Sequence, residues 1–271
     1  MKAVILCVAL ASVAGAQSVQ YKSPSGIEYR AQADTGPIAR ALDSLARDPN
    51  NVQKIIALGV AQAGVWQFRE AIETFSKGLM IAPNDAMLYR WRGHRYLSVR
   101  ELDRALADLQ KGYAIDSTNY GILYHLGIVR FARGEYNEAA RLFTMALPRA
   151  PNAGEQGGSV DWLWMSLMRA GRTADAKAHL DRKPDTQPNT NAYSTRIKLY
   201  RGELRPDQVL AAGDTTNVGR STLNYGLGNW YLVSGDTANA RAAFAASIAA
   251  GGWPGFGFIL SEIELRRLTR R

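Results

Sequence analysis

The sequence predicts an all-α fold in which antiparallel helix hairpins stack side by side into a solenoid. The first observation is a period of 34 residues, since Gly59, Gly93 and Gly127 are each 34 residues apart. The second observation is that four further columns keep the same spacing across three repeats. These columns begin at Ala71, Phe75, Gly78 and Pro83. A fixed period of this length is the sequence signature of stacked supersecondary units.

The columns have a physical meaning on two successive amphipathic helices. Small side chains at Gly59 and Ala71 let the two helix backbones of a hairpin come close together. The aromatic residue four positions after the alanine falls on the same helix face and fills the space between hairpins. The proline near the end of the repeat stops the second helix.

The period predicts three well-formed repeats, at 52–85, 86–119 and 120–153. A degenerate repeat is expected over 157–217, with its extra residues in a loop at 152–158, and a clear repeat returns at 221–254. Trp164 occupies the small-residue column of the degenerate repeat, so we expect a different helix crossing there. With a short helix after Pro37 and a capping helix at 255–269, the solenoid spans 37–271.

The first sixteen residues have the parts of a secretory signal peptide. Lys2 is followed by an apolar run from Ala3 to Val13 and by the small residues Ala14, Gly15 and Ala16. The run is too short to span a bilayer, which takes about 20 apolar residues. We expect cleavage after Ala16 and a bacterial protein that is periplasmic or secreted, with no transmembrane segment; the alternative is a buried N-terminal helix. Residues 17–36 are polar and without period, so a flexible segment is expected there.

The composition limits the classes of partner and cofactor. The 271 residues include one cysteine, Cys7, which excludes a disulfide scaffold and a multi-cysteine metal site. The net charge of +9 does not predict nucleic-acid binding, because the basic residues are spread among acidic ones. At the C-terminus Arg266, Arg267, Arg270 and Arg271 are expected to face water. The alternative for them is weak contact with an anionic envelope surface.

With these columns the chain resembles the tetratricopeptide-repeat family, whose 34-residue period it shares. Its last repeat, with Tyr225, Gly228 and Tyr231, is also similar to bacterial periplasmic scaffold lipoproteins of that family, although it lacks their lipidation cysteine. The resemblance implies a right-handed superhelix whose first helices line a concave groove for a protein or peptide partner. The groove lacks the Lys and Asn pattern with which co-chaperone members of the family bind a C-terminal carboxylate.

Groove positions follow from fixed offsets around the small-residue column. The candidate partner-binding residues are Arg90, Trp91, His94, Leu97, Tyr124, His125, Phe131, Trp162, Met165, Tyr225 and Asn229. Many are large and apolar, which is typical of a binding surface. We therefore expect a non-enzymatic adaptor or scaffold. The alternative is that the N-terminal segment or the compressed repeat folds into the groove and buries them.

A catalytic or metal-binding protein is the alternative from another class. His94 and His125 fall on neighbouring first helices, and Asp161 on the next hairpin completes a two-histidine, one-carboxylate set. No nucleophile-elbow, zinc-protease or phosphate-loop motif occurs in the sequence. No enzyme activity and no cofactor are therefore expected.

Overall fold

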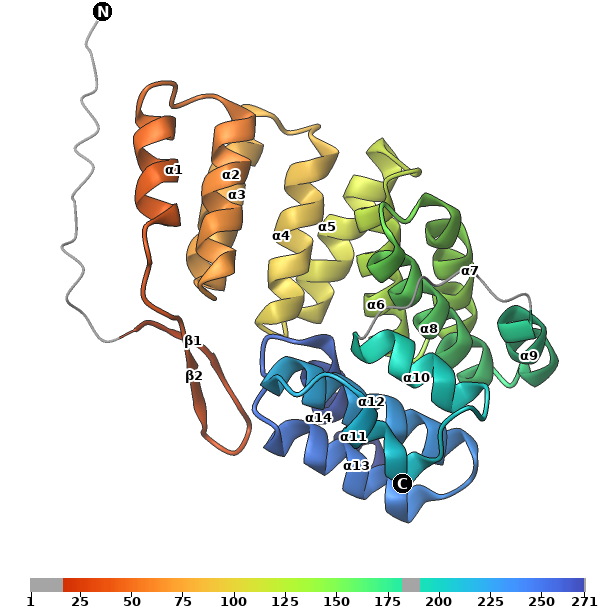
Figure 1. The fold of residues 1–271 in the computed structure, drawn as a ribbon. Coiled ribbons are helices and arrows are strands. Elements are labelled where there is room, and N and C mark those ends of the chain that lie inside the picture. The colour runs from red at the N-terminus through yellow and green to blue at the C-terminus, as the bar shows by residue number, and fades with distance from the viewer. Residues whose placement is uncertain (1–16, 182–190, 271) are drawn as a thin grey trace, which may run out of the picture.

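The computed structural model describes residues 17–181 and 191–270, and within them the all-α solenoid is confirmed (Figure 1). The expected signal peptide at 1–16 lies outside the described residues. The helices α2 and α3 form the first hairpin, and the next hairpins follow in chain order. Their bounds are α1 Pro37–Ala46, α2 Val52–Gly64, α3 Phe68–Ile81, α4 Ala86–Ser98, α5 Leu102–Ile115, α6 Tyr120–Arg133, α7 Tyr136–Ala146, α8 Ala153–Arg169, α9 Thr173–Asp181, α10 Ala192–Tyr200, α11 Val209–Ala212, α12 Asn217–Val233, α13 Thr237–Ala249 and α14 Phe256–Thr269.

The first helices of the three regular hairpins begin at equivalent capping residues. Asn51, Asp85 and Asn119 each accept a hydrogen bond from the backbone N–H three residues later, at 3.2, 2.9 and 3.1 Å. A side-chain acceptor at this position satisfies an N–H group that the helix itself leaves without a partner. The helix starts therefore repeat with the same period of 34 residues.

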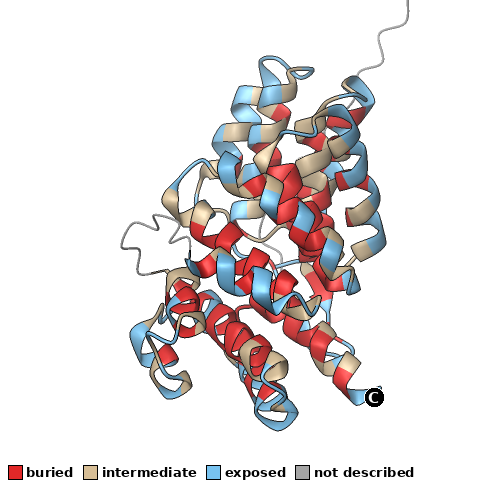
Figure 2. Cartoon of the chain, turned by 90° about the vertical axis from the view of Figure 1, so that its right-hand side faces the viewer, coloured by how far each residue is buried: buried red, intermediate tan, exposed pale blue. Residues whose placement is uncertain are grey.

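The glycines of the small-residue column let the two helices of a hairpin approach closely, as their spacing predicts. A Cβ atom at Gly59 would lie 2.3 Å from the Phe75 ring, and one at Gly127 would lie 2.7 Å from the Phe143 ring. The aromatic ring of the second helix thus packs directly on the backbone of the first. Figure 2 shows the result, with buried residues concentrated where helices face one another.

The expected loop at 152–158 is wrong, because this stretch is helical. Asn152 caps α8 by accepting from the Glu155 N–H at 3.0 Å, and the helix begins at Ala153. Gly158 is buried inside α8, where a Cβ atom would lie 3.0 Å from the Tyr124 hydroxyl. Farther along α8, Trp164 stacks on Tyr200 of α10 with 3.7 Å between ring centroids, which accommodates the bulky residue in the small-residue column.

The expected flexible segment after the signal peptide is also wrong in part. Strands β1 (Val19–Lys22) and β2 (Glu28–Arg30) form an antiparallel hairpin. Tyr29 stacks on Tyr21 and packs against Trp253 and Phe258 at centroid separations of 5.5–5.7 Å. These aromatic contacts hold the segment in place together with Gln20, which is fully buried and accepts from the backbone N–H and the side chain of Arg69.

The C-terminal helix α14 packs on α12 and α13 of the last hairpin and also reaches the start of the solenoid. Arg100, in the turn after α4, forms an ion pair with Glu262 of α14 at 3.0 Å and donates to the Trp253 carbonyl at 3.0 Å. Tyr21 donates to the other Glu262 oxygen at 3.1 Å. Ile259 and Leu260 face inward as expected, each with 1% of its surface exposed. Because Trp253 also packs on Trp66, the first and last repeats touch.

Two turn residues reveal how the closure is built. In each of these hairpins, the turn after the first helix contains one residue with a left-handed backbone conformation. This residue is Gly134, Gly171 or Gly235 in the later hairpins. In the first two hairpins it is Trp66 (φ 61°) and Arg100 (φ 65°). A non-glycine residue there costs about 1–2 kcal/mol. Trp66 packs on Trp253 and Arg100 pairs with Glu262, so these side chains offset that cost by contacting the C-terminal segment.

Replacing Glu262 by Gln should lower the free energy of unfolding by roughly 3–5 kcal/mol, because the buried Arg100 guanidinium loses its counter-charge. Urea unfolding followed by circular dichroism measures the change. The matched control is Glu28→Gln, since Glu28 belongs to an exposed ion pair with Arg30 whose loss should cost less than about 1 kcal/mol. Equal losses in the two variants would contradict the role given to the closure.

Candidate functional site

Most of the predicted groove residues are buried against other parts of the same chain. Eight of the eleven are buried, namely Leu97, Tyr124, His125, Phe131, Trp162, Met165, Tyr225 and Asn229. The groove faces of α6, α8 and α12 meet, since the Trp162 ring lies 5.4 Å from the Phe131 ring and 5.8 Å from the Tyr225 ring. In this conformation most of these side chains are covered, although Tyr124 and His125 still border the pocket described below. Part of the cover comes from the compressed repeat, as one alternative expected, because Arg196 of α10 lies 5.7 Å from the Trp162 ring.

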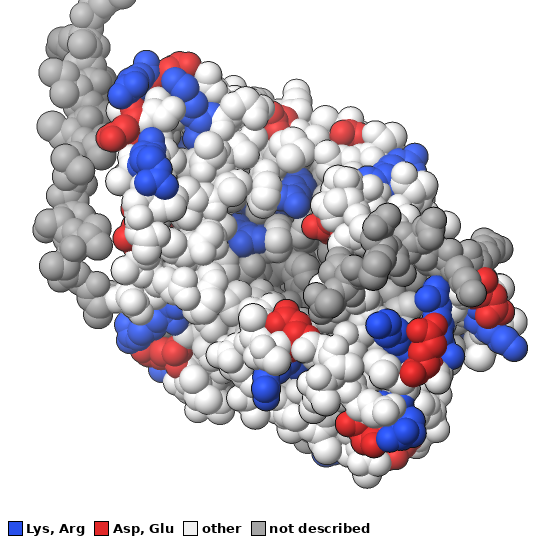
Figure 3. Space-filling view, in the orientation of Figure 1, with Lys and Arg blue, Asp and Glu red and all other residues white. Residues whose placement is uncertain are grey.

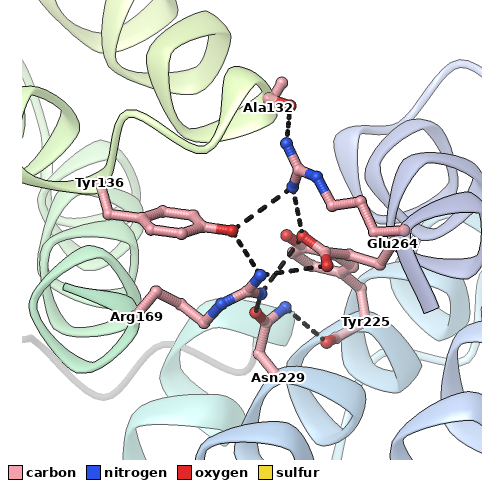
Figure 4. Close-up of polar contacts among 7 residues, drawn as sticks. Ala132, Tyr136, Arg169, Tyr225, Asn229 and Glu264 are labelled. Atoms are coloured by element: carbon pink, nitrogen blue, oxygen red, sulfur yellow. Dashed lines mark hydrogen bonds and ion pairs between the residues drawn. The ribbon is translucent and has the colours of Figure 1, made fainter. Parts of the chain in front are cut away.

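A polar network fixes α14 against this closed stretch (Figure 4). Arg169 of α8 forms an ion pair with Glu264 of α14 at 3.1 Å and donates to the Asn229 side chain of α12 at 2.9 Å. It also donates to the Tyr136 hydroxyl of α7. Glu264 is 2% exposed, and its carboxylate accepts from Arg169 of α8 and from Arg267 of α14. The network thus ties α14 to α8, and it borders a second pocket of about 360 Å³.

Arg267 corrects the expectation that the C-terminal arginines all face water. It forms an ion pair with Glu264 at 2.8 Å and donates to the Ala132 carbonyl at the end of α6. Arg266 and Arg270 are exposed, and Arg271 lies outside the described residues. Contact with an anionic surface stays a prediction for the two exposed arginines.

The candidate metal set is not assembled in the structure. The His94 and His125 rings lie 4.0 Å apart, but Asp161 forms a fully buried ion pair with Arg196 at 2.9 Å. Among the described residues, no group of three His, Cys, Asp or Glu side chains is placed to hold a metal ion. The insertion in the degenerate repeat is helical, and Asp161 consequently points to α10 instead of the two histidines.

The accessible part of the concave side contains a pocket of about 390 Å³ between α4, α6, α8, α10 and α14. Its lining residues are Arg90, His94, Tyr120, Tyr124, His125, Asn152, Gly154, Glu155, Asn191, Tyr193 and Phe256. Figure 3 shows this side of the molecule hollowed near its centre, with basic and acidic atoms in the hollow and mostly uncharged surface over α2 and α4. Three predicted groove residues, Arg90, Trp91 and His94, are only half-buried here.

Arg95 is a buried cation, and Arg90 is a half-buried one with the Glu155 carboxylate nearby. Within the described stretches, neither forms an ion pair, and Arg90 Nη1 and Arg95 Nε have no hydrogen-bond partner. The Arg90 guanidinium lies 3.6 Å from the Trp91 ring centroid. It also packs against α6 at Gly121, where a Cβ atom would lie 2.5 Å from the Arg90 Nε. Burial lowers the pKa of Arg90 to about 10 and that of Arg95 to about 9.

The two histidines beside these arginines are held neutral. Burial and the positive charge of nearby arginines lower the pKa of His94 and of His125 well below the ordinary value. The His125 Nδ1–H donates to the Gly121 carbonyl at 2.5 Å, and Phe256 of α14 packs 5.5 Å from the His94 ring. The pair therefore offers the pocket neutral hydrogen-bonding rings.

Sequence reasoning placed Arg90, His94, Tyr124 and His125 correctly near one another but missed Phe256 and the residues of α10. One signal for α14 was available. Its first half, FGFILS, is apolar on every face, which is typical of a buried helix and not of a polar cap. No comparable signal in the sequence indicates that α10 borders the pocket.

Lowering the pH from 7.5 to 5.0 should destabilise the protein through His94 and His125. The unfolded chain protonates a histidine near pH 6.5 while the folded chain keeps both neutral, so stability falls by at most about 1.4 kcal/mol per pH unit for each histidine. Urea unfolding at both pH values compares the wild type with the double variant His94→Gln, His125→Gln. The double variant should lose less stability on acidification, and an unchanged pH dependence would refute the assignment.

Comparison with known proteins agrees with this architecture. The tetratricopeptide repeat family model matches residues 96–157. No curated protein matches the chain in sequence. Among solved structures, pilF of Pseudomonas aeruginosa is similar with a TM-score of 0.50 and 19% identity over 75% of this chain and 93% of its own.

Two further solved structures are similar at lower scores. The first is YrrB, described as a TPR protein with an unusual peptide-binding site, with a TM-score of 0.49, 14% identity and coverage of 78% of this chain and 91% of its own. The second is MamA, with a TM-score of 0.47, 20% identity and coverage of 62% and 85%. The tetratricopeptide repeat is matched in sequence over residues 96–157, and helix hairpins continue on both sides of this stretch.

Proposed function

We propose that this chain is an exported adaptor that binds a peptide segment of a partner protein along the concave face of α2 and α4. The observation that carries the proposal is the exposed apolar surface of α2. Ala57 and Val60 lie one repeat before Trp91 and His94, and thus at groove positions of the first repeat. Both are exposed, whereas the equivalent residues are half-buried in the second repeat and buried in the third. Exposed apolar residues on a concave face are typical of a binding surface.

The neighbouring helix supports the same face. Trp91 of α4 is half-buried and stacks on Phe75 with 6.4 Å between ring centroids, so its position is fixed by the hairpin core. The surface over α2 and α4 is mostly uncharged (Figure 3). A rigid apolar groove of this kind suits an extended or helical peptide segment.

Export is the second part of the proposal, and the residues that support it are Met1–Ala16. The charged first residues, the short apolar run and the small residues at 14–16 together match the pattern of a cleavable secretory signal. Within the described residues, none of the helices has the length and apolar character needed to cross a membrane.

A photo-crosslinking amino acid placed at Val60 should capture the partner in cells of the natural host. The matched control is the same amino acid at Met80 of α3, which is 78% exposed and belongs to the second helix of the same hairpin. We expect one partner, identified by mass spectrometry, to be crosslinked several-fold more at Val60 than at Met80.

Substitution tests the same surface without a crosslinker. Val60→Asp should reduce co-purification of that partner because a charge is placed in the apolar groove, whereas Met80→Asp should leave it unchanged. Equal capture at both positions, or equal loss in both variants, would rule out the α2 face as the binding surface.

Export predicts a defined mature N-terminus. The protein recovered outside the cytoplasm should have the mass of residues 17–271, because cleavage follows Ala16. Intact-mass spectrometry of the protein from the periplasm or medium measures this directly. Recovery of the full 271-residue chain from the cytoplasm alone would contradict export.

A further inference from the structure

Four helices begin at the border of the central pocket. Tyr120 lies at the start of α6, Asn152 caps α8, Tyr193 is in the first turn of α10 and Phe256 is the first residue of α14. Each helix N-terminus carries partial positive charge from its unpaired backbone N–H groups, and the four add up at one place. The N-cap of α14 is Gly255, which provides no side-chain acceptor to offset that charge.

Two arginines carry positive charge at or behind the wall of the pocket. Arg90 belongs to the lining, and Arg95 lies behind it on the same helix, where it is 7% exposed. Neither forms an ion pair in the described parts of the chain. Glu155 is the acidic side chain in the lining, and its carboxylate accepts from the Tyr120 hydroxyl at 2.8 Å and acts electrostatically on Arg90. The formal charges of Arg90 and Glu155 cancel within the lining, and the excess of positive charge around the two histidines comes from Arg95 and the helix N-termini.

The walls of the pocket are aromatic. The Tyr120 and Tyr124 rings lie 5.6 Å apart, and the Tyr124 hydroxyl donates to the Tyr193 hydroxyl at 3.3 Å. Phe256 closes the side formed by α14. Planar rings of this kind pack well against a planar ligand, while a few polar groups fix its orientation.

We propose that this pocket binds a small organic anion, an aromatic ring that carries a carboxylate or a phosphate group, with the anion next to Arg90. A guanidinium pairs with either oxyanion, and the aromatic walls take the ring. Burial lowers the pKa of Arg90 because it removes water from the charged guanidinium, and a bound anion would offset this desolvation cost. The pocket adjoins the proposed peptide face at Arg90 and Trp91 of α4, but it shares no residue with the α2 surface on which peptide binding is tested.

Calorimetric titration of the whole protein tests the proposal with four probes. Benzoate and phenyl phosphate carry the two candidate anions, benzamide is the neutral counterpart of benzoate, and inorganic phosphate lacks the ring. We expect saturable binding of benzoate, phenyl phosphate or both, and at least about tenfold weaker binding of benzamide and of inorganic phosphate. The stronger of the first two probes identifies the anion.

Arg90→Gln locates the site, and Arg104→Gln is the matched control for net charge. Arg104 is exposed on α5, so its loss should leave binding unchanged, whereas the loss of Arg90 should weaken binding about tenfold or more. Circular dichroism and urea unfolding check that the variants fold. The comparison of benzoate with benzamide needs no variant and stands even if Arg90→Gln fails to fold.

Three results would overturn the proposal. The first is the absence of saturable binding by both aromatic anions at millimolar concentration. The second is equal binding of benzamide and benzoate, or of inorganic and phenyl phosphate. The third is unchanged binding in folded Arg90→Gln. Crosslinking at Val60 has an outcome separate from all three, so failure of one proposal is distinguishable from failure of the other.

Discussion

The buried ion pair between Arg100 and Glu262 is the contact on which the rest of the structure depends. It joins the end of α4 to α14 across 162 residues and brings Trp253 onto the aromatic residues of the N-terminal hairpin. Because α14 is held in the concave side, the groove of the later repeats is filled and Phe256 becomes a wall of the central pocket. A repeat array in which each hairpin contacts only its neighbours would have neither feature.

The arginines of the core fall into two groups, those that are paired with a carboxylate and those that are not. Arg100, Arg169 and Arg196 are each buried beside a carboxylate, and each pair joins helices from different hairpins. Arg95 is buried and Arg90 is half-buried, and within the described residues neither forms an ion pair. Since a buried charge is costly unless it is paired, the unpaired arginines identify the place where an external anion would stabilise the protein most.

Local features were predictable from the sequence, and contacts between distant residues were not. The period of 34 determined the regular hairpins, and the close packing of Gly59 on Phe75 follows from it. Burial of Trp162 and Tyr225 was one of two alternatives at the level of sequence, because it depends on how far the superhelix curls and on where α10 packs, which no repeat column specifies. The helical stretch after Asn152 was mistaken for a loop since glycines dominate it, although Tyr124 occupies the space they leave.

Because α14 follows all the other described helices, its contacts also order the events of synthesis. A regular solenoid gains stability as each hairpin leaves the ribosome, because every hairpin finds its neighbour already present. Here Tyr21 contacts Glu262, a partner 241 residues later, so the N-terminal hairpin and the pocket are completed only after α14 has been made. A chain that stops before residue 256 would lack α14 and would expose the apolar residues that α14 covers.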